Sequence, residues 1–164
     1  MVRIGLLSDT HSFLDDAVFK YFDECDEIWH AGDIGNPELI KKLGAFKPTR
    51  AVYGNIDGAE IRSIFPEVQY FMIESVKIIM MHIGGYPPKY NSISKPILVK
   101  HRPTLFICGH SHIAKAMYDQ QLKLLHLNPG AAGKEGFHLV RTLMRFNINE
   151  DKIEKLEVIE LAKR

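Results

Sequence analysis

The first half of the chain alternates short apolar runs with stretches of helical spacing. Three apolar runs are typical of buried strands: residues 2–7, 27–30 and 51–53. Two stretches between them predict helices: residues 15–24 and residues 36–43. The first places Val18, Phe19 and Phe22 on one face, and the second opens with Asn36 and Pro37, which suit a helix start. This order of strands and helices predicts a parallel sheet.

The second half is dominated by paired apolar runs. We expect three hairpins: residues 68–73 with 77–82 around 74–76, residues 114–118 with 123–127 around 119–121, and residues 137–148 with 152–161 around 149–151. A further strand at 104–108 and a helix at 92–101 complete the pattern, and residues 84–88 are the most loop-like. Two packed sheets flanked by helices accommodate this order. Because no repeat or linker interrupts it, we predict one domain over residues 1–164.

Composition agrees with a soluble globular protein. The 164 residues are 46% hydrophobic and 25% charged, which excludes disordered and fibrous classes. The formal net charge is +1 and the basic residues form no long run, so we expect neither general nucleic-acid binding nor an anionic membrane partner. The composition does not exclude a local basic patch on the surface.

The sequence predicts a cytoplasmic protein without a disulfide. Its longest apolar runs, such as residues 78–81, are far shorter than the roughly 18 residues of a membrane span. Residues 1–3 lead directly into the first strand, without the regions of a secretory signal. The only cysteines, Cys25 and Cys108, lack a Cys-x-x-Cys spacing, and Cys108 ends an apolar run in which a buried thiol is expected.

Aspartate, asparagine and histidine residues recur directly after the apolar runs. Five clusters contain them: Asp9 with His11, Asp33, Asn55, His82, and His110 with His112. Taken singly, each cluster also fits an ordinary polar loop or turn. Taken together, they lie where strands of an open α/β sheet end, which is the usual place of a site. Imidazole, carboxylate and amide ligands suit Mn, Fe, Co or Zn better than Ca.

Seven ligand-capable residues supply eight contacts if Asp33 is shared, as a two-metal hydrolytic site requires. The sequences around them resemble the calcineurin-like metallophosphoesterases, and most closely their small bacterial and archaeal phosphodiesterases. The matching motifs are Ser8-Asp9-Thr10-His11, Gly32-Asp33, Gly54-Asn55-x-Asp57, a strand-ending His82, Gly109-His110-Ser111-His112 and Asn128-Pro129-Gly130. The resemblance spans nearly the whole chain.

The resemblance implies an α/β fold, a four-layer α-β-β-α sandwich of two mixed sheets flanked by helices. It also implies two divalent ions, with Mn favoured and Ni, Co, Fe or Zn as alternatives. The implied ligands of one ion are Asp9, His11, Asp33 and His112, and those of the other are Asp33, Asn55, His82 and His110. Asp33 would bridge the two ions.

The implied activity is hydrolysis of a small phosphodiester by a metal-bridging hydroxide. A catalytically inactive protein-interaction scaffold on the same fold is the alternative, although such scaffolds typically lack a ligand that this chain keeps. A nuclease has only the metal centre in its favour, since no basic groove is visible. A homo-oligomer is possible.

Several positions depart from the family pattern or lie beside it. Ile56 stands where some phosphatases have a histidine after the Asn ligand, so we expect weaker help for poor leaving groups. Ser111 replaces the more usual Thr, and Ile83 separates His82 from the following glycines. His30 either orients a ligand from behind the site or is simply buried. Three further histidines match no ligand position and are assigned to structure or surface: His101, His126 and His138.

Overall fold

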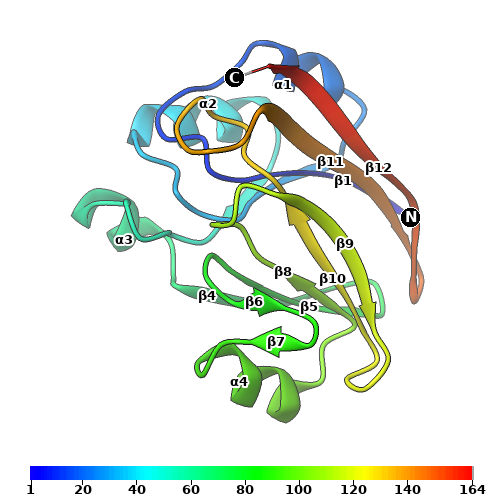
Figure 1. Cartoon of the computed structure of the whole chain (residues 1–164). Coiled ribbons are helices and arrows are strands. Elements are labelled where there is room, and N and C mark those ends of the chain that lie inside the picture. Colours follow the sequence, from blue (N-terminus) through cyan, green and yellow to red (C-terminus); the bar gives the residue numbers. More distant parts are fainter. Residues whose placement is uncertain (164) are drawn as a thin grey trace.

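The computed structural model describes residues 1–163, and two five-stranded mixed sheets face each other in it (Figure 1). The first sheet has the order β12-β11-β1-β2-β3. Its strands are β1 (Val2–Leu7), β2 (Glu27–His30), β3 (Thr49–Ala51), β11 (Val140–Asn149) and β12 (Lys152–Lys163). Strands β1, β2 and β3 are parallel, as the helical crossovers between them require, whereas β11 and β12 add an antiparallel hairpin.

The second sheet has the order β4-β5-β8-β10-β9. Its strands are β4 (Val68–Ile73), β5 (Val76–Met81), β8 (Leu105–Ile107), β9 (Ala114–Asp119) and β10 (Leu124–Pro129). Strands β5, β8 and β10 are parallel, and β4 and β9 close the edges as antiparallel partners. A separate two-stranded hairpin consists of β6 (Gly85–Tyr86) and β7 (Lys89–Tyr90).

Helices cover the outer faces of the sheets. They are α1 (Ala17–Tyr21), α2 (Pro37–Phe46), α3 (Ala59–Ile64) and α4 (Ser94–His101). Val18 of α1 and Leu43 of α2 belong to one buried cluster with Ile28 of the first sheet, and Leu98 of α4 packs with Phe106 of the second. The four-layer α-β-β-α architecture is therefore confirmed.

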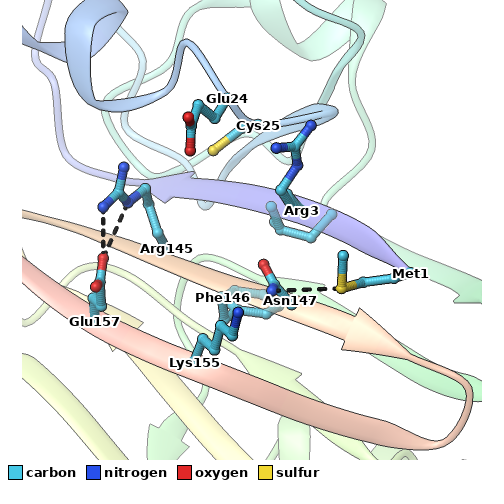
Figure 2. A pocket seen from close by; sticks show the side chains of 10 residues that line it. Met1, Arg3, Glu24, Cys25, Arg145, Phe146, Asn147, Lys155 and Glu157 are labelled. Atoms are coloured by element: carbon cyan, nitrogen blue, oxygen red, sulfur yellow. Dashed lines mark hydrogen bonds and ion pairs between the residues drawn. The ribbon is translucent and has the colours of Figure 1, made fainter.

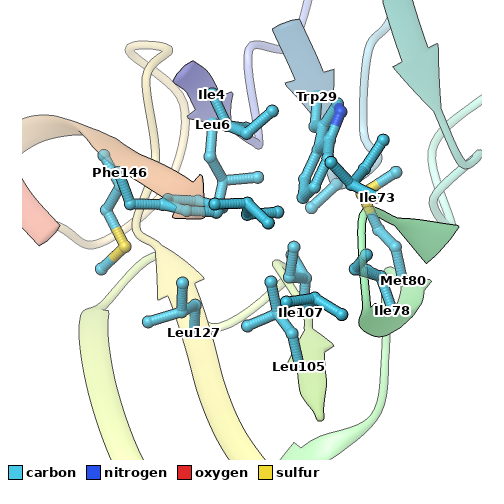
Figure 3. Packing of buried hydrophobic residues seen from close by; sticks show 14 of the residues in the cluster. Ile4, Leu6, Trp29, Ile73, Ile78, Met80, Leu105, Ile107, Leu127 and Phe146 are labelled. Atoms are coloured by element: carbon cyan, nitrogen blue, oxygen red, sulfur yellow. The ribbon is translucent and has the colours of Figure 1, made fainter. Parts of the chain in front are cut away.

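The main core lies between the two sheets (Figure 3). Trp29 and Phe146 of the first sheet are fully buried and form a T-shaped pair with ring centroids 5.7 Å apart. Ile107 and Leu127 of the second sheet face them across the interface. Each such side chain contributes about 1.5–3 kcal/mol on burial, so this layer holds the sheets at a fixed separation.

The first predicted helix is shorter in the structure, because α1 ends at Tyr21. Phe22 leaves the helix and packs its ring over Gly5 of β1, so closely that a Cβ at Gly5 would lie 2.6 Å from the ring. The third strand, β3, covers residues 49–51, two residues before the predicted range of 51–53. The N–H of Tyr53 bonds to the carbonyl of Pro66 instead of continuing the ladder with β2.

Three further segments differ from the sequence expectations. Helix α3 was not predicted, because the residue that precedes it, Gly58, offers no side-chain cap and only Ile61 of the helix is buried. Residues 84–88, which were expected to form a loop, contain β6, and this short strand pairs with β7. Strand β11 begins at Val140 and not at residue 137, since residues 133–139 form a loop at the site described below.

Both cysteines are free and buried, which confirms the expectation of no disulfide. Among residues 1–163, no helix combines the length and apolar character needed to cross a bilayer.

Candidate metal centre

The predicted ligand residues all follow strand ends. Asp9 comes after β1, Asp33 after β2, Asn55 after β3, His82 after β5, and His110 with His112 after β8. Within each sheet these strands are parallel, so their carboxyl ends meet at one edge. Packing of the two sheets brings the two edges together.

Six of the seven side chains form two groups that could each hold a cation. The ligand atoms of Asp9, His11 and His112 lie within 4.8 Å of one another. The same holds for Asp33, His82 and His110. These groups match the division between two ions that the family resemblance implies.

Asp33 lies between the two groups. Its Oδ2 atom is 3.5 Å from Nε2 of His11 and 3.2 Å from Nε2 of His82. Its Oδ1 atom is held by a hydrogen bond of 3.0 Å from the backbone N–H of Ile56. One carboxylate oxygen is therefore anchored to the protein while the other faces both groups, as a bridging ligand requires.

The hydrogen bond of His82 reveals which of its nitrogens is free. Nδ1 lies 2.8 Å from the carbonyl oxygen of Ala31, which can only accept, so Nδ1 carries the proton. Neutral His82 therefore has a lone pair on Nε2, and this atom faces Oδ2 of Asp33 and, at 3.8 Å, Oδ1 of Asp9. Two kinds of acceptor atom point at each other, an arrangement that a cation between them would satisfy.

Buried polar atoms without hydrogen-bond partners support the same conclusion. Oδ1 of Asp9, Nε2 of His11 and Nε2 of His82 are all buried and unpaired. An unsatisfied buried group costs about 1–3 kcal/mol, and here three of them converge on one volume. The donor set thus fits divalent metal ions of the borderline class that accept both nitrogen and oxygen.

Charges within the site shift two pKa values. Burial opposes ionisation of both Asp33 and His82. With no cation between them, a doubly protonated His82 would donate from Nε2 to Asp33. This hydrogen bond and the charge attraction outweigh burial, lowering the pKa of Asp33 and raising the pKa of His82. Asp33 is therefore held as a carboxylate, the form that binds metal.

The backbone at the site adopts a conformation that non-glycine residues rarely take. Five of the candidate ligands have positive φ angles: Asp9 at 52°, His11 at 45°, Asp33 at 54°, His110 at 67° and His112 at 60°. Left-handed backbone costs about 1–3 kcal/mol per residue and clusters at functional sites. Sharp turns after each strand point these side chains into one volume.

Asp57, which belongs to the Gly54-Asn55-x-Asp57 motif, fixes the loops that carry the ligands. Its buried carboxylate accepts hydrogen bonds from the backbone N–H groups of Gly54, Gly35 and Ile34 at 2.8, 2.7 and 3.2 Å. It therefore ties the Asn55 loop to the Asp33 loop. This role is structural, and the sequence motif alone does not reveal it.

His30 acts behind the site through the backbone. Its Nδ1 atom accepts from the N–H of Gly32 at 3.2 Å, so Nε2 carries the proton and donates to Oγ1 of Thr10 at 2.9 Å. Burial lowers the pKa of His30 to about 4, which keeps it neutral. His30 supports the loops of Asp9 and Asp33, and no hydrogen bond to a ligand side chain is seen.

Asn128 explains why the Asn128-Pro129-Gly130 motif accompanies the ligands. Its Nδ2 atom donates to the carbonyl of Gly109 at 2.8 Å and to Oγ of Ser111 at 3.1 Å. Its Oδ1 atom accepts from the N–H of Gly130 at 2.9 Å. This side chain therefore holds the loop that carries His110 and His112.

A cavity of about 350 Å³ opens over the two groups. Asn55 lines it beside Asp33 and is exposed, and its place as a ligand of the second ion stays a prediction. The rim carries three exposed apolar side chains, Ile56, Ile113 and Phe137. Among the described residues that line this cavity, none is lysine or arginine.

A second cavity of about 320 Å³ lies at the opposite, amino end of β1 (Figure 2). Its arginines are already paired, Arg145 with Glu157 at 2.7 Å and Arg3 with Asp26 at 3.5 Å. Burial raises the pKa of the Cys25 thiol to about 11, so this sulfur is a poor nucleophile at neutral pH. The cavity therefore does not compete with the metal centre as a catalytic site.

Sequence comparison places relatives in methanogenic archaea. A probable metallophosphoesterase of Methanothermobacter thermautotrophicus is 31% identical over 138 residues, which cover 78% of this chain and 76% of the relative. Another, from Methanocaldococcus jannaschii, is 31% identical over 164 residues and covers 96% of this chain and 81% of the relative.

Solved structures share the fold at lower identity. A structure described as a novel archaeal phosphodiesterase superposes with a TM-score of 0.79 at 21% identity, covering 97% of this chain and 99% of that one. Vps29 of Entamoeba histolytica, solved in complex with Zn²⁺, gives a TM-score of 0.75 at 17% identity, covering 96% and 98%. The profile of the calcineurin-like phosphoesterase superfamily domain matches residues 2–151. The chain belongs to the calcineurin-like phosphoesterase superfamily, a family of metal-dependent phosphoester hydrolases.

Proposed function

We propose that this protein hydrolyses phosphodiesters with two divalent metal ions. The observation that carries the proposal is the meeting of imidazole nitrogens and carboxylate oxygens around Asp33, several of them buried without a hydrogen-bond partner. One ion would be held by Asp9, His11, Asp33 and His112, and the other by Asp33, Asn55, His82 and His110. Mn²⁺ is our first choice among the ions that such a donor set accepts.

Two neighbouring divalent ions held by these residues would supply Lewis acidity, which lowers the pKa of water and polarises phosphoryl oxygens. The candidate ligands that would hold these ions lie in the turns that follow the strands. Asp9 and Asp33 offset only half of the charge of two divalent ions, so the site keeps a positive charge that attracts an anionic phosphate. No protein nucleophile is needed.

The lining of the cavity favours a diester over a monoester. A monoester carries a second negative charge near neutral pH, and among the described lining residues no lysine or arginine adds to the positive charge that the two ions would supply. The exposed rim residues Ile56, Ile113 and Phe137 instead offer apolar contact to the ester substituents. We therefore propose small diesters with aromatic or apolar substituents as substrates.

An inactive protein-interaction scaffold on this fold is the alternative. The likeness to Vps29 is compatible with it, but that likeness concerns the fold alone. The full set of ligand-capable side chains favours the enzyme, because unpaired buried acids and imidazoles are costly without a cation.

Single-domain organisation, cytoplasmic location and a homo-oligomeric state stay predictions.

Metal counting combined with a turnover assay tests the proposal. The protein would be stripped with a chelator, reloaded with Mn²⁺, Ni²⁺, Co²⁺, Zn²⁺ or Mg²⁺, and assayed on a panel of aryl phosphodiesters and monoesters. We expect two ions per chain and faster hydrolysis of diesters, both lost in His112→Ala. Two bound ions without turnover of any ester would favour the scaffold.

A further inference from the structure

His138 lies beside a candidate ligand, although the sequence assigns it only to structure or surface. It is located in the loop between β10 and β11. Its Nδ1 atom is 3.2 Å from Nδ1 of His112, and its Nε2 atom is 2.9 Å from the carbonyl oxygen of Gly133. The two imidazole rings meet edge to face, with centroids 5.1 Å apart and an interplanar angle of 72°.

These contacts determine where the protons lie. The carbonyl oxygen of Gly133 can only accept, so Nε2 of His138 carries a proton and donates it. Neutral His138 then has a lone pair on Nδ1, which accepts from Nδ1–H of His112. The lone pair of His112 is thereby placed on Nε2, which lies 3.1 Å from Oδ1 of Asp9.

The loop that carries His138 is built around this pair. The backbone N–H of Gly133 donates to the carbonyl of Asp9 at 3.0 Å, which fastens the start of the loop to a ligand residue. Gly136 has a φ angle of 119°, and a Cβ at this position would collide with the ring of His112. Only glycine therefore lets the loop pass close enough for His138 to reach His112.

His82 provides a comparison within the same centre. Its Nδ1–H donates to the backbone carbonyl of Ala31, so the main chain fixes its tautomer. The tautomer of His112 is fixed instead by the side chain of His138, which in turn donates to the carbonyl of Gly133. A side chain can be replaced by mutation, which makes the role of His138 testable.

We infer that His138 is a positioning residue that fixes the tautomer and orientation of His112 towards one of the two ions. This inference rests on the proposed metal role of His112. Partners that orient a metal-binding histidine typically change metal affinity about 10- to 100-fold when they are removed. The effect should be confined to the ion assigned to His112.

The test compares two replacements of His138 that differ in whether they keep a hydrogen-bond acceptor. His138→Asn keeps an acceptor oxygen near the position of Nδ1, whereas His138→Phe keeps the ring and removes the acceptor. His101→Phe makes the same replacement at an exposed histidine of α4, outside the centre. Zn²⁺ affinity would be measured by competition with a chelating dye, after circular dichroism has shown that each variant is folded.

We expect His138→Phe to weaken one of the two Zn²⁺ sites by about 10- to 100-fold, His138→Asn to weaken it less, and His101→Phe to match the wild type. Equal Zn²⁺ affinity in His138→Phe and the wild type would overturn the inference. Failure of the wild type to bind any Zn²⁺ would instead contradict the proposed function.

A second measurement reads the hydrogen bonds directly. The nitrogen chemical shifts of ¹⁵N-labelled histidine at pH 8 identify the protonated nitrogen in the metal-free protein. We expect His138 to be protonated on Nε2 alone. Protonation on Nδ1 would contradict the inference whatever the metal affinities are, and this readout keeps it testable if His138→Phe does not fold.

Discussion

His82 donates a hydrogen bond from Nδ1 to the carbonyl oxygen of Ala31 at 2.8 Å. The backbone of one sheet thereby sets the tautomer of a histidine from the other, because Ala31 follows β2 and His82 follows β5. The lone pair on Nε2 is left facing Asp33. Sheet packing, tautomer and metal site are therefore coupled, and any change that separates the sheets should also weaken the metal centre.

Asp9→Asn separates metal binding from folding. Oδ2 of Asp9 accepts from the N–H of His110, while Oδ1 has no hydrogen-bond partner and faces Nε2 of His112. An amide N–H at the Oδ1 position would donate to that nitrogen, so the metal-free variant should be at least as stable as the wild type. Turnover should fall by more than about 100-fold, beyond the loss typical of an indirect partner.

Thermal unfolding with and without Mn²⁺ checks this expectation. One site saturated at 100 times its Kd stabilises the folded state by about 2.7 kcal/mol, and Asp9→Asn should lose this gain. The matched control is Asp57→Asn, which would point N–H groups at the backbone donors of Gly54 or Gly35. It should lower the free energy of unfolding by about 2–4 kcal/mol with or without metal. Equal metal-induced shifts in Asp9→Asn and wild type would contradict the prediction.

His126 should make the fold sensitive to acid. It is buried on β10 against Phe106, and burial lowers its pKa from 6.5 to about 4. The unfolded chain takes up a proton at a higher pH than the folded chain does, so stability present above pH 6.5 is lost as the pH falls towards 4. His126→Phe removes this contribution.

Denaturant unfolding between pH 7 and pH 4 measures the effect. The pH-dependent loss of stability should be smaller in His126→Phe by roughly 3 kcal/mol at the acid end. The exposed His101 provides the control, since His101→Phe should follow the wild-type curve. Parallel curves for His126→Phe and wild type would rule out this role. His30, which also has a pKa of about 4, should cause part of the slope that remains.

Phe137 should contribute to substrate affinity. It is fully exposed and lines the cavity over the metal centre. An aryl diester that covers part of its ring should gain about 1 kcal/mol of binding free energy, less than the roughly 1.5–3 kcal/mol of a fully buried side chain. Phe137→Ser should therefore raise KM about fivefold with little change in kcat. Leu139→Ser, an exposed residue of the same loop outside the cavity lining, should leave KM unchanged. An equal KM increase in both variants would point to a disturbed loop.

Ile56 should limit the range of leaving groups. Its side chain lines the cavity and is 45% exposed, but it has no proton to donate. Ile56→His should speed hydrolysis of alkyl diesters, in which the leaving oxygen needs protonation, by up to about 100-fold. Nitrophenyl diesters, with a good leaving group, should change little. Ile56→Asn, which is polar without being an acid, is the control, and a similar gain in that variant would exclude proton transfer.

The sequence predicted most of the strands, because short apolar runs such as residues 2–7 are typical of strands buried in a sheet. It also identified the candidate ligands, since polar residues after parallel strands converge at one sheet edge. It missed α3, whose start lacks a side-chain cap, and the extent of the loop at residues 133–139.

Other features depended on contacts between distant segments. Asp57 and Gly35, or His138 and His112, lie in different loops and are brought together only when the strands that carry these loops pack into the folded structure. The protonation of each histidine depends on which acceptor lies beside it, and no local pattern encodes that neighbour. The sequence therefore determined which residues form the strands and supply the metal-binding chemistry, whereas tertiary packing decided their orientation, because hydrogen bonds act only at short range and fixed angles.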